Sequence, residues 1–295
     1  MANLKDIKRK IKSVKNTEKT TRAMKLVSSA KLRRTEELAK RSRVYASKLT
    51  SMIDEIALKI QTLGENANSS VFFANKENPK NIDIIFITAD KGLCGGFNAQ
   101  TLKQVNKLLD SMKSDDVKIR LSAVGRKGID YYNFNNVELS KKIIGLSSAP
   151  NYEDAAAFIS ELSEDFASGK SDKIIMVHNG YVNMITQEIR VDQVLPVDIS
   201  RIDGKVQSES ELEIEPDDDN TLLDALVKKY VEYSMYYALL DSLAAEHAAR
   251  MQAMDAASKN AKDMVKTLSV KYNKARQEAI TTELIEIISG MESMK

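Results

Sequence analysis

The chain has 295 residues, of which 43% are hydrophobic and 29% are charged, and its formal net charge is +2. This composition is typical of a folded protein with one or two domains and excludes an intrinsically disordered chain. One cysteine cannot form an internal disulfide, the N-terminus carries no apolar signal segment, and no apolar run is long enough to cross a bilayer, so we expect a protein of the cytosolic side that is not secreted.

The first 63 residues contain neither Gly nor Pro, so nothing in them interrupts a helix. Apolar or small residues recur in steps of three and four, beginning with Leu4, Ile7, Ile11 and Val14, which is the pattern of a coiled-coil seam. Many later seam positions are Ser, Thr or Ala, which allow close approach of two backbones but bury little apolar area. We therefore predict a long helix over residues 1–63 that requires a partner helix.

This N-terminal helix is strongly basic. Residues 1–45 contain fifteen Lys and Arg against four acidic residues, a net charge of +11. A basic helix can bind nucleic acid or an anionic membrane, although such charge is most often a solvated face. The charges are spread around the helix, and no aromatic residue that could stack on bases precedes Tyr45. A third possibility is a positive helix pair that contacts acidic protein surfaces.

Between residues 71 and 204 the hydrophobic period changes. Short apolar runs typical of buried strands alternate here with stretches of helical spacing. The expected strands are 82–88, 118–124 and 174–178, and the expected helices are 99–112 and 152–166, with a helical or irregular piece at 129–134. Asn179-Gly180 predicts a tight turn, followed by one or two further strands within 182–197. Strands that alternate with helices indicate a small α/β domain with a largely parallel sheet.

The C-terminal part repeats the pattern of the first helix. A polar, acidic linker over 204–220 is followed by a run from Asp217 to Ser289 without Gly or Pro. Its apolar seam would extend over roughly 100 Å at about 1.5 Å per residue, which is more than one compact domain can bury. Thr221 with Asp224 predicts the start of this helix, and Gly290 predicts its end.

The predicted fold class is therefore α/β, with a long antiparallel coiled coil of the N- and C-terminal helices and an inserted α/β domain whose sheet is largely parallel. The expected parts are the N-terminal helix 1–63, the inserted domain 71–204 and the C-terminal helix 217–295.

The segment Gly92–Gly96 follows an expected strand and precedes an expected helix, a position where backbone N–H groups attract phosphate. The segment matches neither the dinucleotide fingerprint nor a P-loop, because it lacks the Lys-Ser/Thr pair. A structural turn is the more common origin of such a segment.

Cys94 near a helix start and His178 at a strand end could meet at the sheet edge where α/β enzymes place their chemistry. No third, orienting group can be identified, and a buried thiol with a packed histidine is the commoner case. His247 lies on the seam among Ala and Met, where packing is the ordinary role. No cluster has metal-ligand spacing, and we expect no cofactor. A thiol or nucleotide enzyme on the α/β domain and a basic scaffold for nucleic acid remain as alternatives, and titration with ATP or NAD and salt-dependent DNA binding would test them.

Three separated blocks of this sequence resemble the gamma subunit of rotary F-type ATP synthases, which forms their central stalk. The blocks are residues 7–34, the turn segment TADKGLCGGFN at 88–98, and residues 249–261 together with 272–290. They extend from one end of the chain to the other, and their order agrees with two terminal helices around an inserted domain.

The resemblance implies a non-catalytic rotor shaft that couples transmembrane proton or sodium flow to ATP synthesis or hydrolysis by turning inside the catalytic ring. The implied partners are three alpha and three beta subunits, the epsilon subunit and the ring of c subunits, with no nucleic acid. The implied location is the cytoplasmic face of the inner membrane, as a peripheral protein.

The resemblance also implies two contacts with the catalytic ring. The upper contact, with a loop of a catalytic subunit, is implied for Arg276, Gln277 and Thr281. The lower contact, with an acidic helix-turn of the beta subunits, is implied for Met24, Lys25, Lys91, Gly92, Cys94 and Gly95. In this interpretation the Gly-rich segment is a protein contact and not a phosphate site.

Overall fold

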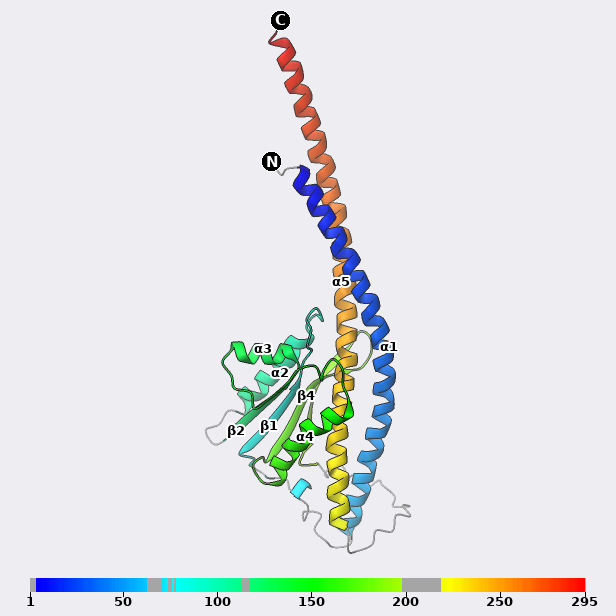
Figure 1. Ribbon diagram of the computed structural model, residues 1–295, viewed down its shortest axis with the longest axis vertical. Coiled ribbons are helices and arrows are strands. Elements are labelled where there is room, and N and C mark those ends of the chain that lie inside the picture. Colours follow the sequence, from blue (N-terminus) through cyan, green and yellow to red (C-terminus); the bar gives the residue numbers. More distant parts are fainter. Residues whose placement is uncertain are drawn as a thin grey trace. The chain divides into compact units, whose positions relative to one another are not determined.

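The computed structural model describes residues 4–62, 71–73, 76, 78–112, 117–197 and 219–294 (Figure 1). Of the predicted acidic linker at 204–220, residues 204–218 lie outside these residues. The chain divides into two compact units, one of Met1–Ser29 with Arg250–Lys295 and the other of Ala30–Ala249. Helix α1 spans Leu4–Thr62 and helix α5 spans Asp219–Glu292, so each long helix contributes residues to both units.

In the first unit, α1 and α5 pair in opposite directions. Thr21 Oγ1 and Ser258 Oγ are 2.7 Å apart, and Lys25 Nζ donates to Asp255 Oδ1 at 2.6 Å. Residue numbers rise on one helix as they fall on the other, which confirms the predicted antiparallel arrangement within this unit. The seam is made of small and polar side chains, among them the buried Ser28, as the sequence predicted.

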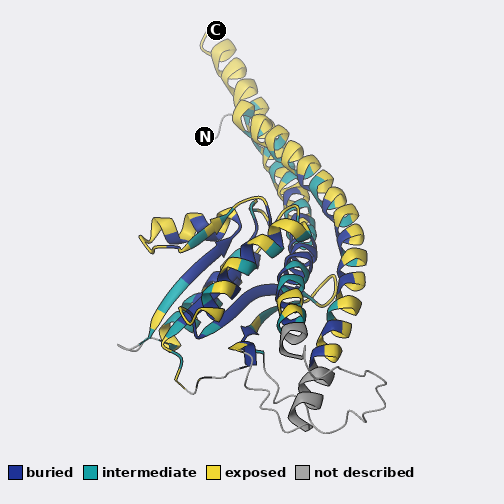
Figure 2. Cartoon of the chain, turned by 60° about the horizontal axis from the view of Figure 1, so that its bottom comes forward, coloured by how far each residue is buried: buried dark blue, intermediate teal, exposed yellow. Residues whose placement is uncertain are grey.

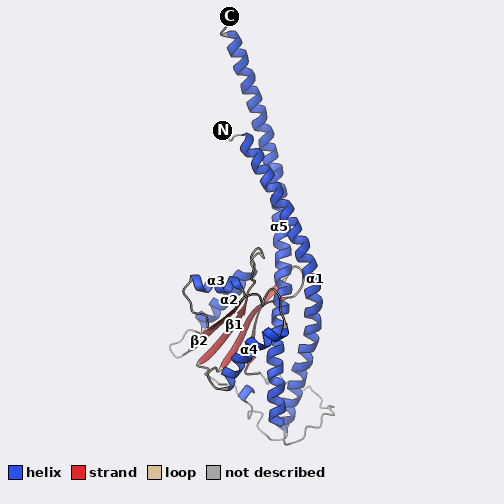
Figure 3. Ribbon diagram, viewed as in Figure 1, coloured by secondary structure: helices blue, strands red, loops and turns tan. Residues whose placement is uncertain are grey.

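The second unit contains a sheet with helices packed beside it (Figure 3). In the described residues it has five strands in the order β3-β2-β1-β4-β5, of which β5 is antiparallel to its neighbour and the others are parallel. The strands are β1 Asn81–Ile87, β2 Lys118–Val124, β3 Lys141–Ile143, β4 Lys173–Tyr181 and β5 Gln187–Leu195. The helices between them are α2 Phe97–Ser111, α3 Arg126–Phe134 and α4 Tyr152–Ala167, and the short 3-10 helix η2 covers Val71–Phe73. The largely parallel sheet is confirmed.

Helices cover both faces of this sheet, which is why the central strands β1 and β4 are buried almost throughout. On β1, Ile84 and Phe86 point toward α2 and α3, where they join a cluster with Val105 and Tyr132. Ile85 and Ile87 point to the other face and join the cluster that includes α4, η2 and the first half of α5. Successive side chains of one strand thus fill two separate cores.

The middle of α5 is buried on all sides. Every residue from 238 to 249 is buried, including the charged or titratable Asp241, Glu246 and His247 (Figure 2). A helix buried all round must be packed by other elements on each face, and the small Ala side chains of this stretch permit that approach. Within the second unit, this segment is therefore the axis around which the other elements pack.

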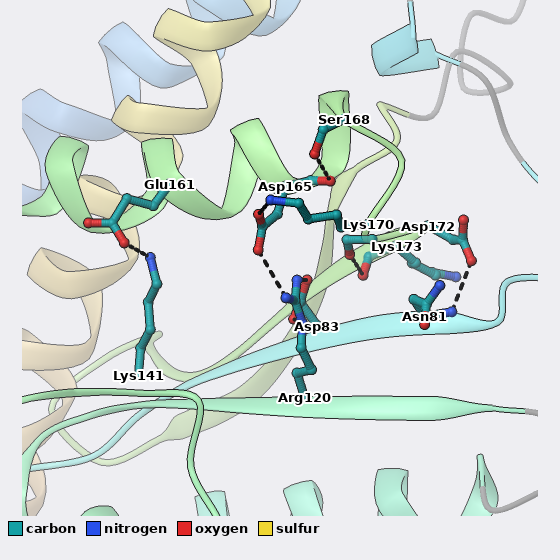
Figure 4. A network of polar contacts seen from close by, with 11 residues as sticks. Asn81, Asp83, Arg120, Lys141, Glu161, Asp165, Ser168, Lys170, Asp172 and Lys173 are labelled. Carbon is teal, nitrogen blue, oxygen red and sulfur yellow. Dashed lines mark hydrogen bonds and ion pairs between the residues drawn. The ribbon is translucent and has the colours of Figure 1, made fainter.

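A polar network fastens α4 to the sheet (Figure 4). Arg120 on β2 donates from Nε and Nη2 to the two carboxylate oxygens of Asp83 on β1, at 2.7 and 2.6 Å, and from Nη1 to Asp165 on α4 at 2.9 Å. The hydrogen bond to Asp83, more than any other contact, raises the pKa of Arg120. Because the Asp83 side chain is only 1% exposed, this bidentate pair satisfies a charge that would otherwise be costly to bury.

The predicted tight turn at Asn179-Gly180 is wrong, because both residues lie inside β4 and pair with β5. Asn179 is buried and donates from Nδ2 to Phe97 O and Thr101 Oγ1. A Cβ on Gly180 would lie 2.3 Å from Nε of Arg190, whose side chain crosses the glycine from the next strand, so any larger residue would require this guanidinium to shift. The hairpin loop follows at residues 182–186.

Two expected helix limits also differ from the structure. α5 begins at Asp219 and not at Thr221, and it continues through Gly290 to Glu292. A glycine inside a helix costs only about 1 kcal/mol relative to alanine, so it does not end a helix whose neighbours favour helix. β3 was not expected, since three residues with two lysines give no apolar run.

Candidate functional site

The Lys91–Gly96 turn, which carries several predicted contact residues, joins β1 to α2. Ala89 N–H donates to Asn98 Oδ1 at 2.9 Å, and Asn98 Nδ2 donates to Cys94 Sγ at 3.3 Å. Cys94 is 2% exposed and packs in a cluster with Phe97, Ala245 and Ala249. The thiol therefore fastens the turn to α5 and does not itself lie on the surface.

The outer side of this turn is formed by Lys91, Leu93 and Gly95. Lys91 and Gly95 are exposed and Gly92 is partly so, and the apolar Leu93 side chain is 63% exposed. Leu93 has a φ of 65° and Gly95 a φ of 59°. A leucine rarely adopts this left-handed conformation, and such residues cluster where binding requires a defined shape. Sequence analysis missed Leu93, because nothing in a Gly-Leu-Cys sequence indicates which residue takes the positive φ.

At the same sheet edge, a carboxylate occupies the start of α3. Asp90 Oδ1 accepts from Arg126 N at the start of α3 at 3.0 Å, and Asp90 Oδ2 accepts from Gly145 N at 3.1 Å. Burial opposes ionisation of Asp90, but these N–H groups and the Ser147 and Ser148 hydroxyls outweigh it and lower the pKa of the carboxyl. The Asp90 carboxylate occupies these two amides, and its negative charge disfavours an anion at the start of α3.

His178 lies in a buried cluster on β4, β5 and α5. Asp241 Oδ2 accepts from Arg190 Nη1 at 2.7 Å and lies 3.3 Å from His178 Nε2, and Asp241 Oδ1 accepts from Tyr181 N at 3.1 Å. Asp192 Oδ2 lies 3.8 Å from His178 Nδ1. Burial lowers the pKa of Arg190, but the Asp241 carboxylate, the Tyr237 hydroxyl and Asp192 outweigh it, so that the pKa lies above its ordinary value.

This cluster joins the β4–β5 pair to α5 and gives His178 a structural role. A cavity of about 380 Å³ borders it, and its lining combines apolar side chains with polar ones such as Arg43 and Ser47. His178 Nδ1 has no protein hydrogen-bond partner, and a cavity of this size and polarity can hold water that satisfies it. Since the thiol of Cys94 packs with Asn98 and Phe97 while the imidazole of His178 packs with Asp241 and Arg190, the structure assigns each to its own cluster.

In the first unit, the predicted upper contact residues Arg276, Gln277 and Thr281 are all exposed on α5. Every residue from 280 to 294 is exposed as well. This end of α5 carries apolar side chains that are 50–67% exposed, namely Ile280, Leu284, Ile285, Ile287, Ile288 and Met291. Many exposed apolar side chains on one short helical segment indicate a surface for a partner.

Met24 and Lys25 lie on α1 in the same unit. Met24 is half-buried, and Lys25 pairs with Asp255. The hydrogen bond from Lys25 and a second from Lys259 lower the pKa of Asp255 to about 2. The charge of Lys25 is thus compensated inside the helix pair, while the neighbouring Leu26 and Val27 are 65% and 57% exposed. Leu26 and Val27 lie between the seam positions Met24 and Ser28, and the sequence pattern did not single them out.

The family model described as ATP synthase matches residues 3–294. The ATP synthase gamma chain of Sulfurovum sp. is 69% identical over 295 residues and covers 100% of both chains, and that of Campylobacter curvus is 60% identical over 296 residues, again with 100% of both chains covered. The chain belongs to the ATP synthase gamma chain family. As a member of this family it is a non-catalytic subunit of the central stalk of an F-type ATP synthase.

Solved structures agree with the fold. The central stalk and c-ring structure of the Tetrahymena thermophila mitochondrial ATP synthase contains a chain that is 25% identical, with a TM-score of 0.61, covering 81% of this chain and 99% of its own length. A chain of the Euglena gracilis mitochondrial ATP synthase is 19% identical with a TM-score of 0.68, covering 99% and 94%. In the described part of the chain, no helix is both long and apolar enough to cross a membrane.

Proposed function

We propose that the chain is the rotating shaft of its ATP synthase and couples transmembrane proton or sodium flow to ATP synthesis and hydrolysis. Its partners in this proposal are three alpha and three beta subunits, the epsilon subunit and the c-subunit ring. The observation that carries the proposal is the 69% identity to a gamma chain over the whole length. Rotation and nucleotide binding are coupled because an asymmetric shaft makes different contacts at each rotational angle. Each angle therefore favours one conformation of each neighbouring subunit.

The chain in this proposal consists of an N-terminal helix at 1–63, an inserted domain at 71–204 and a C-terminal helix at 217–295. The two helices form the shaft inside the catalytic ring, and the inserted domain meets the epsilon subunit and the c ring. The complex lies on the cytoplasmic face of the inner membrane, with this chain as a peripheral component.

The upper contact with a catalytic-subunit loop is proposed for Arg276, Gln277 and Thr281. Their exposure on α5 supports this assignment. Arg276 supplies charge-assisted hydrogen bonds that form and break in each turn. The exposed apolar side chains that follow on α5, from Ile280 to Met291, support the proposal that subunits of the catalytic ring surround this end of the helix.

The lower contact is proposed for two surfaces, one in each unit. On α1, the contact is made around Met24 and Lys25, with the exposed Leu26 and Val27 beside them. In the α/β domain it is made by the turn that contains Lys91, Gly92, Cys94 and Gly95, in which Lys91 faces the acidic helix-turn and the buried Cys94 holds the turn in shape.

The subunit stoichiometry of the native complex tests this proposal. Quantitative mass spectrometry of the complex purified from solubilised membranes is expected to give one copy of this chain for every three catalytic subunits. Equal copy numbers would contradict a single central shaft. Calorimetric titration of the isolated chain with ATP is expected to give no binding heat, because the chain is a non-catalytic subunit.

A further inference from the structure

A cluster of tyrosines joins α1, α4 and α5 within the second unit. Four of the ten tyrosines of the chain lie between residues 230 and 237. Two of these four, Tyr233 and Tyr236, make ring contacts with each other and with Tyr152 of α4. Tyr233 also contacts the ring of Tyr45 on α1. Neither proposed contact with the catalytic ring uses these residues.

Tyr45 and Tyr233 form the closest ring pair of this cluster. Their ring centroids are 4.3 Å apart at an interplanar angle of 52°. The other ring pairs of the cluster have centroids 5.8, 6.0 and 6.2 Å apart. At 4.3 Å the ring carbons of two phenols are in van der Waals contact. A bond between these two rings would therefore require a movement of the side chains but not of the helices that carry them.

The surroundings hold the Tyr233 ring in place beside Tyr45. The hydroxyl oxygen of Tyr233 accepts a hydrogen bond from Ser42 Oγ of α1 at 3.1 Å. The ring of Tyr152 contacts the ring of Tyr233 at a centroid distance of 6.2 Å. Tyr152 is itself fixed, since its hydroxyl donates to Glu232 Oε2 at 2.5 Å and accepts from Lys229 Nζ at 2.8 Å. Groups that are held in contact in this way react with each other in preference to more distant partners.

Tyr45 gives this pair access to solvent. Its side chain is 49% exposed, whereas Tyr233 is half-buried. A small one-electron oxidant can therefore reach Tyr45 directly, and Tyr233 can be oxidised through its contact with Tyr45. A phenol that loses one electron and one proton becomes a phenoxyl radical, whose unpaired electron is shared between the oxygen and the ring carbons that include the two Cε atoms. The exposed member of the pair thus makes both rings oxidisable.

We propose that Tyr45 and Tyr233 are a site of oxidative modification, at which one-electron oxidants derived from peroxide join the two rings by a carbon–carbon bond to give dityrosine. Each phenol loses one electron and one proton, and one Cε atom of each resulting radical contributes its unpaired electron to the new bond. The hydrogen on each bonded Cε then leaves as a proton while the phenolic oxygen takes up a proton, which restores both phenols. The two electrons and two protons that are released reduce one molecule of hydrogen peroxide to two molecules of water, with cleavage of its O–O bond. The bond ties α1 to α5 inside a single chain.

Brief photo-oxidation of the purified complex tests this site. Illuminated tris(bipyridyl)ruthenium with persulfate supplies a small one-electron oxidant, and dimerisation of N-acetyltyrosine in a parallel sample shows that the oxidant was produced. After digestion with trypsin, residues 44–48, whose only tyrosine is Tyr45, are expected to be joined to residues 230–250. Mass spectrometry should find this product at two hydrogen atoms below the summed mass of the two peptides. Absence of the product at a dose that dimerises N-acetyltyrosine would overturn the proposal.

Conservative variants identify the two partners. Tyr45→Phe and Tyr233→Phe keep a ring at each position but remove the hydroxyl group whose oxidation starts the reaction, so each is expected to abolish the linked peptide. Tyr236→Phe is the matched control, because this residue lies on the same tryptic peptide and contacts the same Tyr233 ring, and the linked peptide is expected to persist. Persistence in Tyr233→Phe, loss in Tyr236→Phe, or a product that joins Tyr45 to another subunit in place of Tyr233 would overturn the proposal.

Discussion

Asp241 is expected to determine how firmly the β4–β5 hairpin is attached to the shaft, and Asp241→Ala removes this attachment. The side chain is 5% exposed and accepts from Arg190 and from the Tyr181 amide. Removal leaves a partly buried guanidinium without its carboxylate and a backbone N–H without an acceptor.

The cost can be estimated from these two groups. Breaking a buried ion pair by removal of one partner costs about 3–5 kcal/mol, and the lower end applies because Arg190 is 26% exposed and can be partly hydrated. The unpaired Tyr181 N–H adds about 1 kcal/mol. We therefore expect the local stability of β4 and β5 to fall by about 4 kcal/mol, which is roughly a thousand-fold change in the opening equilibrium.

Amide hydrogen exchange of β4 and β5 in the full chain measures this opening. Asp192→Ala is the matched control, because it removes a second carboxylate beside His178. The Asp192 side chain is 54% exposed, so we expect its removal to cost less than about 1 kcal/mol. Asp241→Asn keeps an acceptor for Tyr181 N, so its loss of amide protection in β4 and β5 is expected to lie between those of Asp241→Ala and Asp192→Ala. Equal loss of protection in Asp241→Ala and Asp192→Ala would refute the idea that the buried carboxylate holds the hairpin to α5.

Three further predictions concern other parts of the chain. Gly180→Ala is expected to lower the free energy of unfolding by about 2 kcal/mol, because the added Cβ would lie 2.3 Å from Nε of Arg190, and thermal unfolding measures this loss. Arg276→Ala is expected to lower the number of ions pumped per ATP hydrolysed without any change in nucleotide binding by this chain, as measured on reconstituted vesicles. The pKa of Asp255 is about 2 in the folded chain, below its value of 3.8 in the unfolded chain. The pairing with Lys25 therefore stabilises the helix pair above about pH 4, and this stabilisation is lost as the pH falls toward 2. Circular dichroism of the helices would record the loss.

Each of these predictions has a matched control. Gly96→Ala should cost far less than Gly180→Ala, since its Cβ would make only ordinary contacts with Gln100. Lys271→Ala, an exposed change on the same helix, should leave pumping unaltered, and a similar loss there would contradict a specific role for Arg276. Asp255→Asn should abolish the acid transition in the helix pair, and persistence of the transition would show that other groups produce it.

The sequence predicted the elements that are encoded by a continuous pattern of neighbouring residues. α1 and α5 follow from runs without Gly or Pro, and β1, β2 and β4 follow from apolar runs that both faces of a covered sheet require. The pairing of the two helices followed from their length, because neither could be buried alone.

The elements that escaped prediction depend on residues far away in the sequence. Asn179-Gly180 has the composition of a turn, but its conformation is set by Arg190 crossing the glycine and by Thr101 binding the asparagine. Likewise, the exposed Leu93 and Ile185 look like core residues in the sequence, and only the turns that hold them show that they face solvent. Local pattern identifies what a segment can form, whereas tertiary contacts decide which option is taken.

Rotation of this chain within the catalytic ring is the most direct test of the account. With the ring immobilised and a bead attached to an exposed position of the α/β domain, such as Phe134→Cys labelled with biotin, ATP is expected to drive continuous rotation in one direction. Rotation should stop when the chain is cross-linked to the ring and resume when the link is cleaved. A bead that stays fixed while the same complexes hydrolyse ATP would contradict the account.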